Sequence, residues 1–426
     1  MVLAAHDVAN LVAHAKEGVD HLGIPLFARP GTEDRVDLLV GHPFAVGAVA
    51  GHGVEGVDDA ADAAVDRNGR VAVAAWIARA IVALMVRDQQ RADELSKEFG
   101  ARRGYSDWRA LLQNNEVDAV HIATPVHLHE EQVIAAADAG KHVMCDKPMA
   151  MSMSECRRMI DACRRNDVHL QVCFLMRFGS VYQRLRRQIA AGEFGKILEV
   201  RATIFKWIEL DSGSWRVKPE YGGGGPLMDL GAHTIDLITY LIGPMATVTA
   251  FASNRVEHWD TEDTVSVLMR SESGAHAIVG HSFRAKGGDS CVEINGSEKS
   301  AFVATNPETG KATLSIFDGS EWKSEPMPWE NYYQLQVEHF ADCLAGKTEP
   351  IVTGHDGLVN IATIEAAYRS SRRALARRSS GDSALFGRQL RAPAVRRASG
   401  PRRRRALPGR SSGSRRCLAV RAAGPR

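Results

Sequence analysis

The sequence predicts a parallel α/β domain followed by an α+β domain with a large, mostly antiparallel sheet. Between residues 81 and 191, short apolar runs alternate with helical segments, which is typical of βαβ units. From residue 246 onward, strand-like runs follow one another with few helices between them. This pattern indicates an antiparallel sheet with helices on one face. The chain of 426 residues is long enough for both domains.

The first domain is predicted from continuous apolar runs and from helices that have an apolar stripe and a polar or glycine stop. Such runs are typical of strands that are buried on both faces of a sheet. The expected strands are 81–86, 117–124, 141–145 and 169–176, and the expected helices are 90–99, 108–112, 129–139, 154–165 and 181–191. The arrangement is Rossmann-type, with an irregular first strand, loop and helix.

The second domain is predicted from alternating apolar and polar residues, the period of a strand with one buried face. The expected strands are 196–207, 246–254, 264–271, 276–284, 290–296, 300–304, 312–318 and 322–327. A helix is expected to begin at Pro226, and two more to cover 332–344 and 356–373. The helix at Pro226 therefore lies at the junction of the two domains.

Polar residues follow the expected parallel strands at the edge where such sheets bind ligands. The strand ends deliver Arg87, then Thr124 and Pro125, then Asp146 and Lys147. Because the carboxyl ends of parallel strands meet at one crevice, we expect these residues to border one ligand.

The stretch 222–241 combines four glycines, Pro226 and a helical pattern. The glycines leave a backbone that another group can approach closely, and proline presets the φ angle of a first helical position. Asp229 and His233 are four residues apart and Asp236 is three further on, so all three lie on or near one helix face. A carboxylate and an imidazole at this spacing can bind a substrate hydroxyl and move its proton. An ordinary Asp/His pair on a helix surface is the alternative interpretation.

Six segments together resemble the Gfo/Idh/MocA family of nicotinamide-dependent oxidoreductases, over about residues 70–375. They are 123–131 (ATPVHLHEE), 140–150 (GKHVMCDKPMA), 176–178 (MRF), 192–197 (GEFGKI), the pair Trp215-Arg216, and 222–237 (GGGGPLMDLGAHTIDL). A set in this order and at matching separations is much more specific than a single motif.

The resemblance implies catalytic roles for three residues. Lys147 matches the family lysine that bonds the reacting hydroxyl and takes part in proton transfer. Asp229 and His233 match the acid and the histidine of the family's substrate site. Oxidation of a secondary alcohol sends a hydride to the nicotinamide and a proton to a base, and these residue types suit that proton transfer.

The resemblance also implies residues that border the cofactor. Asp146 stands where the family often has Glu, at the nicotinamide end of the cofactor. Thr124, Pro125 and His129 match the loop beside the cofactor, and Arg177 corresponds to a residue that lines the mouth of the active site.

The glycine loop for the cofactor phosphates has two candidate places. The segment 51–56 (GHGVEG) is a literal G-x-G-x-x-G after a short apolar run. In the alternative, 70–73 is the first strand and residues near Trp76 form the loop. There, Ala74 and Ala75 replace the glycines and would put a Cβ atom where the pyrophosphate must approach.

The end of the second strand bears on the choice of cofactor. Val86 stands where an acid for the ribose hydroxyls is expected, and Arg87 follows it. A missing acid beside an arginine favours a 2′-phosphate, so the expected cofactor is NADP or NAD, with NADP favoured.

We expect four segments in the chain: an irregular N-terminal extension (1–69), a Rossmann-like dinucleotide-binding domain (70–150), an α+β substrate and oligomerisation domain (151–375), and an Arg-rich disordered tail (376–426). Residues 372–426 hold 17 Arg and one acid, with no apolar period. We do not expect this tail to bind nucleic acid, because a charge run is most often simply solvated. Alternatively, both ends of the chain are out-of-frame sequence.

The composition is that of a soluble globular protein, with no secretory signal and no apolar stretch that spans a bilayer comfortably. We therefore expect a cytoplasmic protein without membrane contact. The seven cysteines are scattered and include no CxxC pair, which favours reduced thiols over disulfides or a zinc site.

The expected function is that of an NAD(P)-dependent dehydrogenase or reductase, which acts on a secondary alcohol of a sugar, polyol or similar cyclic substrate. By resemblance, we expect a homo-oligomer. The alternative is a protein of the same fold whose cofactor binding is impaired because the glycine loop is missing or displaced.

Overall fold

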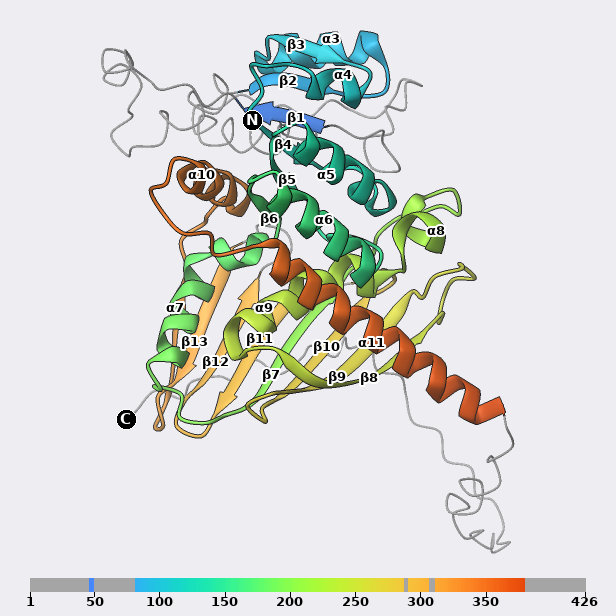
Figure 1. Ribbon diagram of the computed structural model, residues 1–426. Coiled ribbons are helices and arrows are strands. Elements are labelled where there is room, and N and C mark those ends of the chain that lie inside the picture. Colours follow the sequence, from blue (N-terminus) through green and yellow to red (C-terminus); the bar gives the residue numbers. More distant parts are fainter. Residues whose placement is uncertain (1–45, 50–80, 287–289, 306–310, 380–426) are drawn as a thin grey trace, which may run out of the picture. The chain divides into compact units, whose positions relative to one another are not determined.

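The computed structural model describes residues 46–49, 81–286, 290–305 and 311–379 (Figure 1). Both candidate phosphate loops, at 51–56 and near Trp76, and the tail from residue 380 lie outside the described residues. Within these described ranges, no helix is both long and apolar enough to cross a membrane.

The first sheet has six strands in the order β3-β2-β1-β4-β5-β6. They are β1 (Val46–Val49), β2 (Ile81–Met85), β3 (Arg103–Tyr105), β4 (Ala119–Ile122), β5 (His142–Cys145) and β6 (Leu170–Val172). β2 pairs with β3, β4 with β5, and β5 with β6, all in parallel, which confirms the predicted parallel sheet. β3 escaped prediction because Arg-Gly-Tyr has no apolar run.

Helices cover both faces of this sheet. On one face, α3 (Gln89–Phe99) and α10 (Tyr332–Leu344) pack in one cluster with Leu84 and Met144 of the strands. On the other face lie α4 (Trp108–Leu112), α5 (His129–Asp138) and α6 (Met153–Arg165), which pack against Val120 and Val143. α10 comes from the far end of the described chain, so the second domain completes the first (Figure 1).

β1 differs from its neighbours because it runs antiparallel to both β2 and β4. Its first residue, Val46, pairs with Ile122 at the carboxyl end of β4, and Val49 pairs with Ile81 at the start of β2. The chain therefore leaves β1 at the edge where the parallel strands begin. The sequence indicated a short apolar run here, but it did not predict that this strand runs antiparallel to its neighbours.

The second sheet has eight strands in the order β14-β13-β12-β11-β7-β10-β9-β8. They are β7 (Ile197–Phe205), β8 (Met245–Ser253), β9 (Thr264–Ser271), β10 (His276–Ser282), β11 (Ser290–Gly296), β12 (Ser300–Thr305), β13 (Ala312–Phe317) and β14 (Trp322–Pro326). Only the β7 and β10 pair, among these described strands, is parallel. The mostly antiparallel second sheet is thus confirmed.

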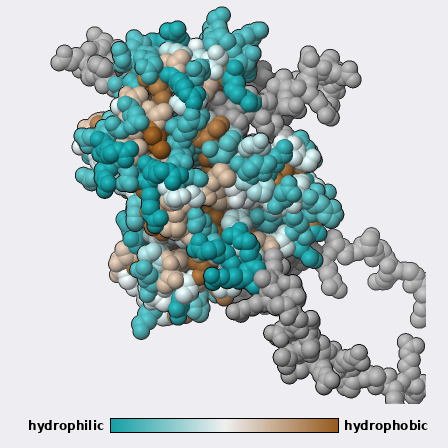
Figure 2. All heavy atoms as spheres, turned by 45° about the vertical axis from the view of Figure 1, so that its right-hand side comes forward, coloured by the Kyte–Doolittle hydropathy of each residue, from teal (hydrophilic) through white to brown (hydrophobic). Residues whose placement is uncertain are grey.

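Helices α7 (Ser180–Ala190), α9 (Ala232–Ile242) and α11 (Gly354–Ser379) lie over one face of the second sheet (Figure 1). Residues along these strands therefore alternate between the face beneath the helices and the uncovered face. In β9, Val265, Val267 and Met269 are buried beneath the helices, whereas Leu268 is 53% exposed on the other face. Figure 2 shows a mostly hydrophilic surface in its view, with hydrophobic residues in small patches.

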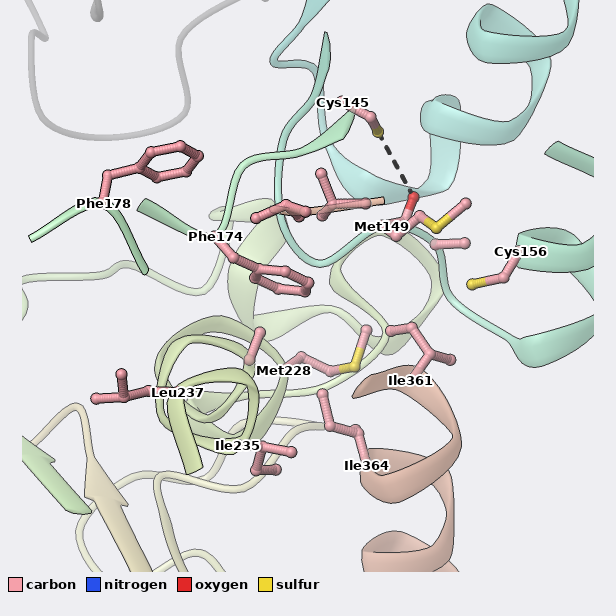
Figure 3. Packing of buried hydrophobic residues seen from close by; sticks show 14 of the residues in the cluster. Cys145, Met149, Cys156, Phe174, Phe178, Met228, Ile235, Leu237, Ile361 and Ile364 are labelled. Atoms are coloured by element: carbon pink, nitrogen blue, oxygen red, sulfur yellow. Dashed lines mark hydrogen bonds between the residues drawn. The ribbon is translucent and has the colours of Figure 1, made fainter. Parts of the chain in front are cut away.

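One core joins the two sheets. Met149, which follows β5, packs with Met228, which precedes α9, and with Ile361 and Ile364 of α11 (Figure 3). Gly357 of α11 lies so close to the Met149 sulfur that a side chain there would collide with it. The core therefore fixes the spacing between the end of β5 and the start of α9. The expected start of the Rossmann-like domain at residue 70 and its end at residue 150 stay predictions. The first sheet extends beyond both, because it includes β1 before residue 70 and β6 after residue 150.

Candidate active site

Lys147 lies in a tight turn directly after β5. The Asp146 N–H donates to the Ile122 carbonyl at 2.8 Å, and the Asp146 carboxylate accepts the Lys147 N–H at 2.7 Å. The peptide bond between Lys147 and Pro148 is cis. The two hydrogen bonds keep the turn at the carboxyl edge of the sheet.

Asp229 lies in a widened turn before α9. A short helix, α8 (Pro219–Gly222), ends at Gly223, whose positive φ of 73° favours glycine. After Pro226, residues Leu227–Gly231 form one π-helical turn, and regular helix begins at Ala232. The predicted helix start is confirmed, but the first turn is π rather than α. Such single π turns occur frequently at functional sites.

Other parts of the protein occupy the space beside the four glycines. A Cβ atom on Gly224 would collide with the Tyr368 hydroxyl, and one on Gly225 would collide with the Glu262 carbonyl. The prediction that another group can approach this backbone closely is therefore confirmed for these two glycines, and the groups that approach come from distant segments of the chain.

Lys147, Asp229 and Arg216 form the charged centre of the site. The Lys147 Nζ atom donates to Asp229 Oδ1 at 2.5 Å and to the Asp229 carbonyl at 3.1 Å. Arg216 Nε lies 3.5 Å from Asp229 Oδ2, and its guanidinium stacks on Trp215 at 4.4 Å from the ring centroid. Burial raises the pKa of Asp229, but the charges of Lys147 and Arg216 outweigh it and hold that pKa well below its usual range. Asp229 is therefore ionised.

His233 is half-buried on the first turn of α9, and its Nδ1 atom has no hydrogen-bond partner among the described residues. Burial and the positive charge of Lys147 lower the pKa of His233 to about 3, although the Asp229 charge opposes the shift. The exposed Lys206 adds a further positive charge that lowers this pKa. His233 is thus a neutral imidazole with one nitrogen that can take a proton or a hydrogen bond.

The low pKa of His233 predicts a loss of stability in acid. A free histidine titrates near pH 6.5, so between about pH 6.5 and pH 3 the unfolded chain binds a proton that folded His233 does not. Each such histidine lowers the free energy of unfolding by about 1.4 kcal/mol per pH unit as the pH falls through this window. The buried His281, whose pKa burial also lowers to about 3, acts in the same direction.

Urea unfolding at about pH 7 and about pH 5 measures this dependence. The free energy of unfolding should fall more steeply towards acid in the wild type than in His233→Gln or in His281→Gln. An unchanged difference between the two pH values in both variants would contradict neutral, buried imidazoles.

Thr124, Pro125 and His129, which the sequence assigned to the loop beside the cofactor, follow β4. Their polar atoms are engaged with the protein. The Thr124 hydroxyl donates to Gln132, and the His129 ring nitrogens face the carbonyl of Thr124 at 2.8 Å and that of Pro148 at 3.1 Å. Burial lowers the pKa of His129, and the Asp146 charge opposes this shift. His129 thus links the end of β4 to the turn that holds Lys147.

Arg87 is exposed at the end of β2, and the Val86 side chain before it is buried. Asp88 caps α3, where its Oδ1 atom accepts the Arg91 N–H at 2.7 Å. The described end of β2 therefore presents a cation, as expected from the sequence.

Arg177 and Asp236 form a buried ion pair. The Arg177 side chain is only 5% exposed, and it donates to both Asp236 oxygens at 2.9 and 2.6 Å. It also donates to Asp356 and to the Ile351 carbonyl, each at 2.9 Å. Burial in this network does not fit a place at the mouth of the site. The Asp236 carboxylate is thus engaged by Arg177, although Asp236 lies three residues after His233 on α9.

Two family models match the chain. The "Oxidoreductase family, NAD-binding Rossmann fold" matches residues 47–174, and the "GFO/IDH/MocA C-terminal domain" matches residues 182–302. Together these segments span more than half of the sequence. The chain belongs to the Gfo/Idh/MocA family of NAD(P)-dependent oxidoreductases.

Several Gfo/Idh/MocA relatives align over most of their length. A 1,5-anhydro-D-fructose reductase of Ensifer adhaerens is 28% identical over 296 residues, which cover 68% of this chain and 88% of the relative. A scyllo-inositol 2-dehydrogenase (NAD(+)) of Bacillus subtilis is 29% identical over 293 residues, or 66% of this chain and 83% of the relative. The structure of a levoglucosan dehydrogenase in complex with NADH and levoglucosan has a TM-score of 0.62 at 26% identity, with 68% and 87% coverage.

Three residues of the site in this Gfo/Idh/MocA chain were not among the predicted ones. Arg216 contacts Asp229, and the Trp215-Arg216 motif was the signal that could have found it. Lys206 acts on His233, but it follows an ordinary strand and gives no local signal. Glu262 binds the turn that carries Asp229, and its distance in sequence hides it.

Proposed function

We propose that this protein oxidises or reduces a secondary alcohol or ketone of a sugar, polyol or similar cyclic substrate with NAD(P), and that Lys147, Asp229 and His233 are its catalytic residues. The observation that carries the proposal is the contact between Lys147 and Asp229, which joins the carboxyl end of β5 to the start of α9. The Ensifer adhaerens and Bacillus subtilis relatives, by their names, act on a sugar derivative and on an inositol. Both substrates are polyhydroxylated rings, which supports a substrate of the same kind here.

Lys147 and His233 handle the proton in this proposal. The Lys147 ammonium, held by Asp229, binds the reacting oxygen, and neutral His233 accepts the proton that leaves the hydroxyl during oxidation. In the reverse direction, the same pair returns a proton to the oxygen of the ketone. Asp229 stays ionised beside Lys147 and Arg216, so it orients the lysine and can accept a substrate hydroxyl.

The described residues fit the nicotinamide end of a cofactor. Thr124, Pro125 and Asp146 would border it at the carboxyl ends of β4 and β5, the edge where such sheets bind ligands. When bound, the nicotinamide accepts or supplies the hydride. The residues that would hold the phosphates are not among the described ones. The family match that begins at Gly47 supports the segment 51–56 as the phosphate loop.

A second candidate function is a protein of this fold without effective cofactor binding. The antiparallel direction of β1 favours it, since the chain leaves β1 at the edge opposite Lys147. Under this candidate, neither NADH nor NADPH would bind, and the pair of Lys147 and Asp229 would serve only to join the two sheets.

We propose NADP as the preferred cofactor, and Arg87 provides the test. A cation at the end of β2 can bind a 2′-phosphate, and the next residue, Asp88, uses one carboxylate oxygen to cap α3. Arg87→Ala should weaken NADPH binding about tenfold and NADH binding by less than about twofold, as expected for one lost charged hydrogen bond. Fluorescence titration with both cofactors measures the loss of affinity for NADPH and for NADH. Equal losses for the two would contradict the assignment.

We also propose a homo-oligomer through the uncovered face of the second sheet. Phe251, Leu268 and Trp322 are each more than half exposed there, on three strands of that sheet. Apolar residues on an uncovered sheet face are suited to a self-association interface.

The proposed function is tested by following reduction of NAD⁺ and NADP⁺ with a panel of aldoses, inositols and anhydrosugars. We expect turnover of at least one of them by the wild type and none above background by Lys147→Met. Equal activity of the two proteins would overturn the roles assigned to the site. Binding of the cofactors without turnover of any panel member would overturn the proposed substrate class.

A further inference from the structure

A buried carboxylate lies behind the substrate site. Glu262, just before β9, is 9% exposed and accepts the Gly225 N–H at 3.1 Å and the Leu227 N–H at 3.0 Å. Tyr368 of α11 donates its hydroxyl to the same carboxylate at 2.8 Å. Three segments that are far apart in the sequence therefore meet at one side chain.

The two amides that Glu262 binds precede and open the helical turn of Asp229. N–H groups at the start of a helix have no partner within the helix, and a carboxylate there also interacts favourably with the helix dipole. The turn continues directly from this point, because the Asp229 N–H donates to the Gly225 carbonyl at 3.2 Å. A shift of Gly225 therefore moves Asp229.

The same turn is also held at its other end and is closely packed at its start. Asn360 of α11 donates to the Ala232 carbonyl at 2.9 Å, just after the π turn. Gly224 and Gly225 pack so closely against Tyr368 and Glu262 that neither could carry a Cβ atom without a collision. The π turn is thus clamped between the segment before β9 and α11.

We infer that Glu262 is a positioning residue of the active site: by binding Gly225 and Leu227, it fixes the π turn that holds Asp229 against Lys147. The inference rests on the proposed function for its effect on turnover, because Lys147 and Asp229 are the catalytic residues there. The clamp itself is a property of the fold and can be measured without substrate.

The first measurement follows Lys147 by reductive methylation and mass spectrometry. Lys147 is only 14% exposed and is paired with Asp229. In Glu262→Gln, one acceptor of the clamp becomes an amide, so Lys147 should react several-fold faster than in the wild type. Lys141 serves as the internal control, since it lies before the same strand and binds the Asn114 carbonyl at 3.1 Å. Its rate should not change.

The second measurement is a double-mutant cycle on kcat. Glu262→Gln should lower kcat about tenfold to a hundredfold, the scale of a small misplacement of a catalytic group, with cofactor affinity unchanged. In the Asp229→Asn background, the same change should cost less than about twofold, because Glu262 acts through Asp229. Glu330→Gln is the matched control: Glu330 accepts the Ser180 N–H at 2.9 Å at the start of α7, away from the site. It should leave kcat unchanged.

The outcomes separate the inference from the proposed function. An unchanged rate of Lys147 methylation in Glu262→Gln overturns the clamp, and an equal loss of kcat in both backgrounds overturns its action through Asp229. If the wild type turns over no substrate, the proposed function fails, while faster methylation of Lys147 alone still supports the clamp. If Glu262→Gln does not fold, Tyr368→Phe, which removes a single donor to Glu262, should show the same changes at smaller size, and their absence overturns the inference.

Discussion

Lys147→Met should lower kcat by about 10²–10⁴-fold, the usual contribution of a positioned acid or base, and should change the affinity for the cofactor by no more than a few-fold. The ammonium of Lys147 is the donor nearest to Asp229, so its loss removes the group that we assign to the reacting oxygen. Asp229 keeps Arg216 at 3.5 Å, and the variant should therefore remain folded. Steady-state kinetics, cofactor titration and thermal unfolding measure the three effects.

Lys141→Met is the matched control for this substitution. Lys141 precedes the strand that Lys147 follows, and it binds a backbone carbonyl at the opposite edge of the sheet. The control should keep wild-type kcat. If Lys141→Met and Lys147→Met lost kcat to a similar extent, the loss would come from a general effect of removing a lysine near β5 on the fold. It would not come from a role of Lys147 in the reaction.

Arg177→Ala should lower the free energy of unfolding by about 3–5 kcal/mol, because it leaves Asp236 buried without its partner. For a protein of this size, such a loss corresponds to a fall in Tm on the order of 10 °C. The contacts of Arg177 with Asp356 and the Ile351 carbonyl add to the loss, since both hold the start of α11. Chemical denaturation and thermal unfolding measure the change.

Arg164→Ala provides the comparison. Arg164 pairs with Asp161 on the exposed surface of α6, so its loss should cost no more than about 1 kcal/mol. The Arg177 experiment also decides between two roles. Unchanged stability together with weaker cofactor binding in Arg177→Ala would favour the mouth of the active site and contradict the buried network.

Much of the fold could be predicted from the sequence because its strands are apolar runs with clear ends. The strand before Lys147 ends where Asp146 and a proline follow, so the position of the lysine at the carboxyl edge was predictable. β1 was different. Val46–Val49 gives a strand signal, but nothing in four residues specifies the direction in which a strand pairs.

Within the candidate site, spacing along one helix was predictable and partners from distant segments were not. Asp229 and His233 were found from their separation of four residues. Asp236 lies three residues after His233 in the regular helix α9, but Arg177 binds its carboxylate, and spacing along a helix cannot predict that partner. Arg177 itself follows an apolar strand, and no local pattern shows that this arginine is buried and paired with two acids.

The glycine-rich stretch illustrates the same limit. Four consecutive glycines correctly indicated close approach of another group to the backbone. The groups that approach, Tyr368 and Glu262, lie in α11 and before β9, and tertiary packing alone brings them there.

The most direct test of the central claim, that this chain carries a working hydride-transfer site, is titration of the chain with NADH and with NADPH, followed by nicotinamide fluorescence. We expect saturable binding of at least one of them, tighter for NADPH, and binding within a few-fold of the wild type in Lys147→Met. Failure of both cofactors to bind would contradict a working hydride-transfer site and favour a Gfo/Idh/MocA fold that has lost its cofactor.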